Sequence, residues 1–177
     1  MIKVGFIGAG DISLLHSEGV HSSENAVLTG IWNRTRKKAE EKSGLFNCRV
    51  FDQVEDLIKE VDVVYVLTNM ETHHQYARQA IDAGKHVLVE KPTAVTIEEI
   101  EDLKKAAKAQ GVQVAPVHNY IYEPSVTRAK DLIESGKIGD LVSLYVLYNI
   151  HHPESVAARY PGVIRQILTH HAYCTLY

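Results

Sequence analysis

The stretch KVGFIGAGDIS, residues 3–13, decides the fold of this chain. Its apolar beginning, residues 3–7, indicates a buried strand, and a helical pattern follows the glycines. Gly8 would allow a tight turn, Gly10 would let a phosphate approach the main chain, and Ser13 is small enough for close helix–strand packing. This GxGxxS pattern between a first strand and a first helix predicts the turn of a dinucleotide-binding sheet.

The rest of the chain repeats the alternation of strand and helix. Further apolar runs, nearly continuous as in strands buried on both faces, occupy residues 27–32, 61–67, 86–89 and 112–117. Helical segments lie between them. The pattern predicts an α/β fold, a Rossmann-like doubly wound parallel sheet, with its ligand at the carboxyl ends of the strands.

Several residues mark the expected helix ends. Thr96 with Glu99 three positions later is a capping box, and Gly111 is expected to close the same helix. Gly44 is expected to end the helix that begins near Thr35. After about residue 120 the pattern changes: residues 141–150 suggest one further strand, and a helical stretch ends the chain.

Composition narrows the class of protein. The chain has 177 residues, 45% of them hydrophobic, and a formal net charge of −3, which gives no reason to expect nucleic acid or an anionic membrane as a partner. No apolar stretch approaches the length of a membrane span, and the start does not resemble a signal peptide. Two isolated cysteines fit a reducing compartment. We therefore expect a cytoplasmic protein.

The nucleotide phosphates are expected on the first turn and on the N-terminus of the helix that follows it. The residues expected to contact them are Gly8, Ala9, Gly10, Asp11 and Ile12. At the end of the second strand, Asn33 stands where NAD-binding proteins have a carboxylate, and Arg34 follows. Arg34 can pair with a 2′-phosphate or simply lie on an exposed helix. The cofactor is therefore NADP or NAD, with NADP slightly favoured.

Three blocks of the sequence resemble the glucose–fructose oxidoreductase/inositol dehydrogenase (Gfo/Idh/MocA) family. They are GAGDIS in the first turn, TNMETHHQYARQAIDAGKHVLVEKPTAVTIEE at 68–99, and GKIGDL at 136–141. The resemblance implies an NAD(P)-binding Rossmann domain, residues 1–120. It also implies that residues 121–177 are a partial C-terminal substrate and oligomerisation domain that looks truncated. The implied activity is hydride transfer between the nicotinamide and a sugar or polyol hydroxyl or carbonyl.

The block GKHVLVEKP carries the catalytic expectation. The resemblance makes Lys91 an active-site residue, and its place after the strand 86–89 puts it in the ligand crevice. An ammonium there can stabilise the oxygen of the reacting carbon. Pro92 would fix the turn, with either a trans or a cis peptide bond before it. Glu90 would either anchor the turn or contact the nicotinamide ribose. Further cofactor contacts are expected at Thr68, Asn69, Met70, His73, Glu90, Lys91 and Asn119.

The resemblance implies a histidine acid/base in the last helix. His170 fits, in the stretch PGVIRQILTH, where Gln166 replaces the usual Asp of the family. Gln166 and His170 still share a helix face at i,i+4 spacing, while the adjacent His171 is a rival for the role. Pairs of neighbouring histidines lack partners with metal-ligand spacing, so no metal site is expected.

Three functions stay open from the sequence. The first is an NAD(P)-dependent dehydrogenase or reductase acting on CH–OH groups of a small sugar or polyol. The second is a redox-neutral NAD-dependent enzyme that cleaves glycosides, and the third is a dinucleotide-binding protein without chemistry. We also expect a homo-oligomer formed through the second-domain sheet, and neither a nucleic-acid nor a membrane partner.

Overall fold

The computed structural model describes residues 1–149, 151, 154 and 163–177, and the side chains of these except 163–166. The chain divides into two compact units, Met1–Val117 and His118–Tyr177.

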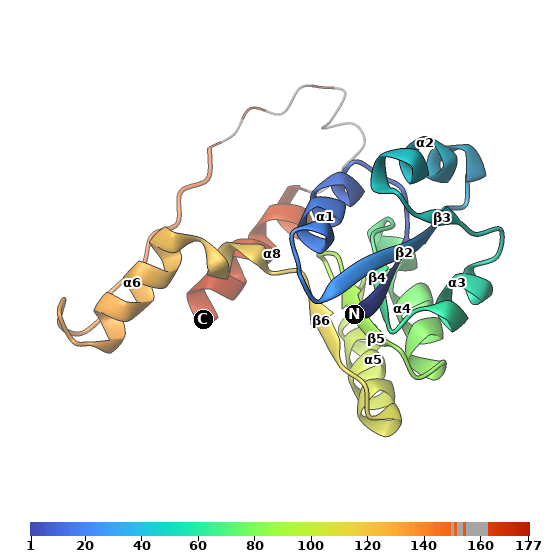
Figure 1. The fold of residues 1–177 in the computed structure, drawn as a ribbon. Coiled ribbons are helices and arrows are strands. Elements are labelled where there is room, and N and C mark those ends of the chain that lie inside the picture. Colours follow the sequence, from blue (N-terminus) through green and yellow to red (C-terminus); the bar gives the residue numbers. More distant parts are fainter. Residues whose placement is uncertain (150, 152–153, 155–162) are drawn as a thin grey trace. The chain divides into compact units, whose positions relative to one another are not determined.

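The first unit is a six-stranded parallel sheet with the order β3-β2-β1-β4-β5-β6 (Figure 1). This confirms the predicted α/β fold. The strands are β1 (Ile2–Ile7), β2 (Ala26–Trp32), β3 (Arg49–Val50), β4 (Val63–Val66), β5 (His86–Val89) and β6 (Val114–Pro116). The helices are α1 (Ile12–His21), α2 (Arg36–Phe46), α3 (Val54–Glu60), α4 (His73–Asp82) and α5 (Ile97–Gln110), with a short 3-10 helix, η1 (Met70–Thr72), before α4.

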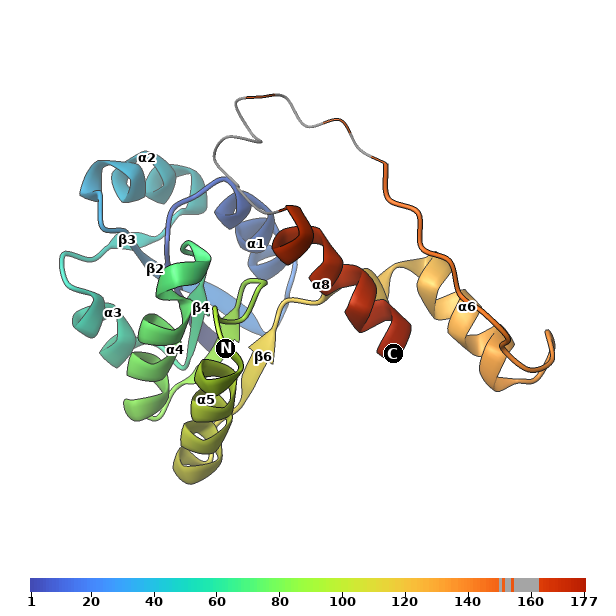
Figure 2. The same ribbon diagram turned by 180° about the vertical axis from the view of Figure 1, so that it is seen from behind.

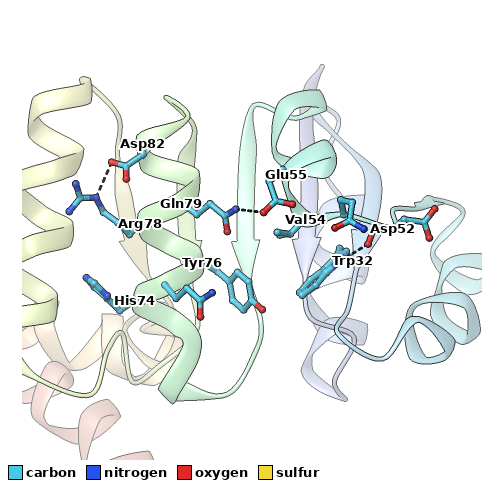
Figure 3. Close-up of a pocket in the computed structure, with 11 residues that line it drawn as sticks. Trp32, Asp52, Val54, Glu55, His74, Tyr76, Arg78, Gln79 and Asp82 are labelled. Carbon is cyan, nitrogen blue, oxygen red and sulfur yellow. Dashed lines mark hydrogen bonds and ion pairs between the residues drawn. The ribbon is translucent and has the colours of Figure 1, made fainter.

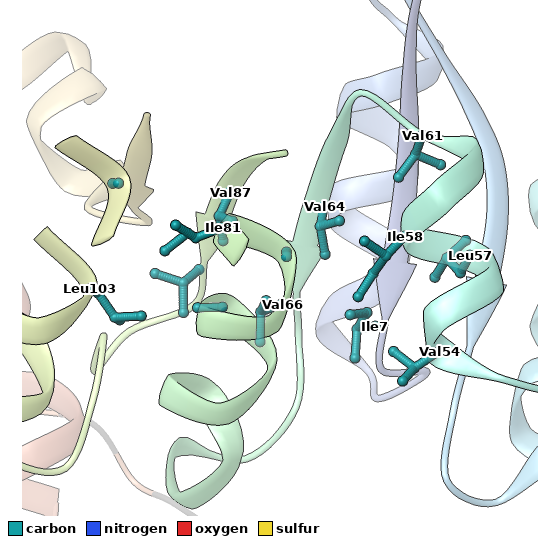
Figure 4. Packing of buried hydrophobic residues seen from close by; sticks show 14 of the residues in the cluster. Ile7, Val54, Leu57, Ile58, Val61, Val64, Val66, Ile81, Val87 and Leu103 are labelled. Carbon is teal, nitrogen blue, oxygen red and sulfur yellow. The ribbon is translucent and has the colours of Figure 1, made fainter. Parts of the chain in front are cut away.

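Helices cover both faces of this sheet. On one face, α1 and α2 bury Val20, Ala39 and Phe46 against strand residues such as Phe6 and Ile31. On the other face, α3, α4 and α5 bury a larger cluster against β1, β4 and β5, drawn in Figure 4. Figure 2 shows α4 and α5 side by side on this face. Because both faces are covered, the strands are apolar nearly throughout, which is why the sequence revealed them.

The helix ends follow local chemistry, with one correction. Thr96 and Glu99 form the predicted capping box, and Gly111, at φ 67°, closes α5. The prediction that Gly44 ends α2 is wrong, because the helix continues to Phe46. It ends instead at Asn47, which takes the left-handed conformation at φ 48° and ψ 49°. Asparagine tolerates this conformation better than most residues other than glycine.

The described part of the second unit contains η2 (Asn119–Tyr122), α6 (Pro124–Glu134) and α8 (Val163–Leu176). The predicted strand at 141–150 is not formed, because residues 141–149 have no regular secondary structure and residue 150 lies outside the described residues. A lone strand has no partner for its backbone hydrogen bonds, so its β-rich composition is not enough to form it. Across the described residues, no helix is long and apolar enough to cross a membrane.

Candidate nucleotide and catalytic site

The predicted site residues of the first unit gather at one edge of the sheet. In a parallel sheet the carboxyl ends of all strands meet at the same edge, so the segments after β1, β2, β4 and β5 converge there. The strand order reverses between β1 and β4, which lie next to each other. That reversal is the switch point at which doubly wound sheets bind their ligands.

The glycine turn after β1 has the geometry that a dinucleotide requires. Gly8 has φ 118°, and a Cβ there would lie 2.6 Å from the carbonyl oxygen of Leu67. A Cβ on Gly10 would meet no atom within 4 Å, so the main chain at Gly10 faces open space. Ser13, fully buried, donates from its hydroxyl to the Gly10 carbonyl over 2.6 Å. The turn is closed on its inner side and open where a phosphate would approach.

The start of the first helix lies at the glycine turn, where the Ser13 and Leu14 N–H groups donate to the Gly10 and Asp11 carbonyls over 3.1 and 3.2 Å. Asp11 stands at the N-cap of α1 but makes no side-chain capping hydrogen bond, and the first turn carries no acidic residue. The first backbone N–H groups of a helix have no partner within the helix and carry a partial positive charge. Together with the open face of Gly10, this arrangement fits the pyrophosphate of a dinucleotide.

Asn33 joins the end of β2 to the glycine turn. Its side-chain oxygen accepts a hydrogen bond from the Ala9 backbone N–H over 3.0 Å, and its amide nitrogen donates to the Thr35 carbonyl over 2.9 Å. Arg34 is exposed beside it and forms no ion pair within the described part of the chain, whereas Arg36 pairs with acidic neighbours. The side chain of Arg34 is therefore available to a ligand at this edge.

Glu90 and Lys91 follow β5 at the same edge. Glu90 is only 7% exposed, and one of its carboxylate oxygens lies 2.8 Å from Nε2 of His16 on α1. The other oxygen accepts the backbone N–H of Lys91 over 3.0 Å. The Lys91–Pro92 peptide bond is cis, which is one of the two alternatives that the sequence left open.

The charge state of Glu90 follows from these contacts. Burial alone raises the pKa of the Glu90 carboxyl, but the hydrogen bond and charge of His16, the backbone N–H of Lys91 and the charge of Lys91 outweigh it. The net result is a pKa below its ordinary value, so Glu90 is a carboxylate at neutral pH. His16 was not predicted as a site residue, because nothing in the sequence marks a contact between residues 74 positions apart.

His73 lies at the start of α4 and is 1% exposed. Its Nδ1 is 2.7 Å from the Pro92 carbonyl oxygen, and its Nε2 is 2.9 Å from the Thr68 carbonyl oxygen. Thr68 also accepts a hydrogen bond from the Thr72 hydroxyl over 2.8 Å. The structure thus places Thr68 at the edge with Lys91, while both ring nitrogens of His73 face main-chain oxygens. Asn69 and Met70, also predicted to contact the cofactor, follow Thr68 in the same loop, and Asn69 is exposed.

A hollow of about 740 Å³ on the first unit is lined by none of these residues (Figure 3). Trp32 from the end of β2 and Tyr76 from α4 meet in it with ring centroids 5.4 Å apart. Gln79 donates to Glu55 across it over 2.7 Å. Its lining includes neither glycine of the turn nor Lys91, so we assign the site from the strand ends and not from this hollow.

The other two predicted residues, Asn119 and His170, belong to the second unit. There, His170 is 5% exposed and its ring stacks on Tyr120 with centroids 4.1 Å apart. His118 stacks in the same way on Tyr173, at 3.9 Å. These two pairs pack α8 on η2.

The rings of the second unit differ in their surroundings. Burial lowers the pKa of His118. The pKa of Tyr120 is raised, mainly by burial and next by its neighbour Tyr148. His171, the rival acid/base, is half-buried and tilted against Tyr148 at 5.2 Å. The side chain of Gln166 lies outside the described residues. Within the described residues, no group of three or more His, Cys, Asp or Glu is placed to hold a metal ion.

Comparison with known proteins agrees with this geometry. Residues 2–118 match the sequence profile of the Gfo/Idh/MocA proteins, described as an oxidoreductase family with an NAD-binding Rossmann fold. Glucose-6-phosphate 3-dehydrogenase of Bacillus subtilis (strain 168) is 33% identical over 146 residues, which are 82% of this chain and 42% of that protein. The scyllo-inositol 2-dehydrogenase (NADP(+)) of the same organism is 32% identical over 162 residues, 90% of this chain and 44% of that protein.

The solved structures give the same result. Scyllo-inositol dehydrogenase from Lactobacillus casei, with bound NAD(H) and scyllo-inositol, superposes with a TM-score of 0.73 at 26% identity, over 79% of this chain and 43% of that one. The chain spans less than half the length of these relatives. With a profile match over most of its length, the chain belongs to the Gfo/Idh/MocA oxidoreductase family, which has an NAD-binding Rossmann fold.

Proposed function

We propose that the first unit binds NADP(H) or NAD(H), and that the whole protein transfers hydride between the nicotinamide and a sugar or polyol. The observation that carries the proposal is the position of Lys91. It follows β5 at the sheet edge where the glycine turn opens toward a ligand. The relatives named above as dehydrogenases of a sugar phosphate and of an inositol support the substrate class.

The residues suggest how the reaction would proceed. A bound nicotinamide supplies the hydride acceptor in oxidation and the hydride donor in reduction. In oxidation, the substrate carbon loses a hydride and its hydroxyl loses a proton, which leaves a carbonyl. Lys91 would donate a hydrogen bond to the reacting oxygen and stabilise the negative charge that develops there. His170 would receive the hydroxyl proton, a role that rests on the family resemblance.

The chemistry at the end of β2 supports a preference for NADP. Asn33 is neutral and its oxygen already accepts the Ala9 N–H, so no carboxylate is present there to repel a 2′-phosphate. Arg34, exposed and outside any ion pair of the described chain, can pair with that phosphate in a bidentate way. We also propose cofactor contacts for five further residues, as the family resemblance implies: Thr68, Asn69, Met70, Glu90 and Asn119.

Two further properties are proposed from the sequence. We infer a cytoplasmic location from the isolated cysteines, and a homo-oligomer from the family resemblance. Val142 and Leu147 are 94% and 88% exposed in the second unit, so the segment 141–149 offers apolar side chains for association. Analytical ultracentrifugation of the whole protein tests the oligomer. A monomer at all concentrations would contradict it.

The proposed function is tested by binding and by turnover. Fluorescence titration of the whole protein with NADPH and with NADH should show saturable binding of both, at least as tight for NADPH. A panel of sugars, sugar phosphates and polyols should then give absorbance changes at the nicotinamide band with at least one substrate. Failure to bind either nucleotide would contradict the proposal. Stoichiometric bound cofactor without net turnover of added nucleotide would favour the redox-neutral alternative.

A further inference from the structure

We propose that His16 and His73 are positioning residues, which hold the turn of Glu90, Lys91 and Pro92 from opposite faces of the sheet. The two histidines together are called the two-histidine brace. Its catalytic consequence rests on the proposed function, because it concerns where Lys91 stands when the reacting oxygen arrives. Its existence is a property of the first unit alone.

One half of the brace comes from α1. This helix packs on the face that buries Phe6, and the His16 ring meets Phe6 and Tyr65 edge-on, at 6.4 Å and 5.6 Å. A carboxylate only accepts hydrogen bonds, so Nε2 of His16 carries the hydrogen in its 2.8 Å contact with Glu90. The aromatic neighbours fix the ring, and the ring fixes the carboxylate that receives the Lys91 backbone N–H.

The other half comes from α4, on the opposite face. Ala77, Ala80 and Ile81 of this helix pack with Val87 and Val89 of β5. His73 opens the helix and lies between the carbonyl oxygens of Thr68 and Pro92, at 2.9 Å and 2.7 Å. Carbonyl oxygens are acceptors, so the ring donates to whichever of the two faces a nitrogen that carries a hydrogen. The His73 ring lies between the loop after β4 and the turn after β5 and is within hydrogen-bonding distance of both.

The two halves act on the residues that flank Lys91. Glu90 is held from the α1 side and Pro92 from the α4 side, and both contacts are partly buried. A short turn held on both flanks leaves its middle residue little freedom, and displacing a reacting group by about 1 Å can cost on the order of 100-fold in rate. The brace gives a role to the buried His73 and the half-buried His16, which take no part in the proposed hydride or proton transfer.

Hydrogen exchange tests the brace without any substrate. We compare the Lys91 amide in the wild type, His16→Ala and His73→Ala by NMR or mass spectrometry. Loss of either contact should speed exchange of that amide by about threefold to tenfold, as expected for one net hydrogen bond. His16→Gln, whose amide can still donate to Glu90, should restore part of the protection, and His73→Gln serves where His73→Ala unfolds. Matched controls are His21→Ala on α1 and His74→Ala on α4, which should leave the amide unchanged.

Kinetics test whether the brace acts through Lys91. In the whole protein, His16→Ala should slow single-turnover hydride transfer on the order of 10- to 100-fold while cofactor affinity changes less than about threefold. In a Lys91→Ala background the same substitution should have almost no further effect, because the residue it positions is gone. An equal loss in both backgrounds would overturn the role, since it would show general damage.

The outcomes separate the brace from the proposed function. Faster amide exchange in the histidine variants, in a protein that transfers no hydride, would retain the brace and reject the function. Normal hydride transfer by the wild type, with unchanged exchange at Lys91 in both histidine variants, would reject the brace and retain the function.

Discussion

Replacing Gly10 with alanine should separate nucleotide binding from stability. A Cβ on Gly10 meets no atom within 4 Å, and Gly10 is not among the glycines with positive φ. The folded protein can therefore accept the methyl group, and the less flexible unfolded chain should make Gly10→Ala about 0.4–1 kcal/mol more stable. The same methyl group occupies the space through which a pyrophosphate would approach, so NADPH affinity should fall at least about 10-fold, or about 1.4 kcal/mol.

Gly8→Ala supplies the contrast. At φ 118°, with a Cβ 2.6 Å from the Leu67 carbonyl oxygen, alanine at this position is strained and forces the main chain to move. The cost should be at least about 1–3 kcal/mol of unfolding free energy. Gly19→Ala, within α1 and also without contacts, is the control and should be more stable by about 1 kcal/mol.

Urea unfolding and NADPH titration of the three variants measure stability and nucleotide binding separately. We expect Gly10→Ala to be stable and to bind NADPH poorly, Gly8→Ala to be unstable, and Gly19→Ala to be stable and to bind NADPH normally. Undiminished NADPH affinity in Gly10→Ala would refute the placement of the phosphates on this turn.

Three other predictions concern single residues. Asn33→Asp should shift the ratio of NADPH to NADH affinity toward NADH, because a carboxylate repels the 2′-phosphate; an unchanged ratio in paired titrations would count against the assignment. The pKa of Glu90 is lowered by folding, so its contribution to stability is present above its ordinary value of 4.5 and is lost as the pH falls through the folded value. Glu90→Gln should therefore lose less unfolding free energy than the wild type between about pH 5 and pH 3 in urea titrations, and identical pH profiles would contradict this. Thr96→Ala removes the capping bond to the Glu99 N–H and should cost about 0.5–2 kcal/mol in thermal or urea unfolding, with no change in nucleotide affinity.

Much of the fold was predictable because the strands are buried on both faces. Continuous apolar runs in the sequence predicted β1, β2, β4, β5 and β6. The glycine pattern GxGxxS predicted the turn between β1 and α1. The segment containing β3 and α3 was missed. β3 has two residues and α3 has seven, which is too short for a period of two or of 3.6 to emerge. Gly44 was misread because a glycine inside a helix looks, in sequence, like a glycine that ends one.

The candidate site was predictable only where it is local in sequence. Gly8, Gly10 and Lys91 follow strands directly, so knowing the strands places them at the sheet edge. The contacts of Glu90 with His16 and of Pro92 with His73 join residues 74 and 19 positions apart. No pattern in one sequence marks such pairs, because they arise from how α1 and α4 pack on the two faces. The segment 141–149 shows the reverse case, since its β-rich composition forms no strand without a partner.

The most direct test of the central claim is single-turnover hydride transfer by Lys91→Ala, measured beside a cofactor titration of the same variant in the whole protein. In the proposed function, Lys91 acts on the reacting oxygen, while the glycine turn, the start of α1 and Arg34 hold the nucleotide. The account predicts a loss on the order of 100- to 1000-fold in the rate of hydride transfer, as for removal of one electrostatic donor, with cofactor affinity nearly unchanged. Normal hydride transfer in Lys91→Ala would contradict a catalytic role, and lost nucleotide binding with it would make Lys91 an anchor for the cofactor instead.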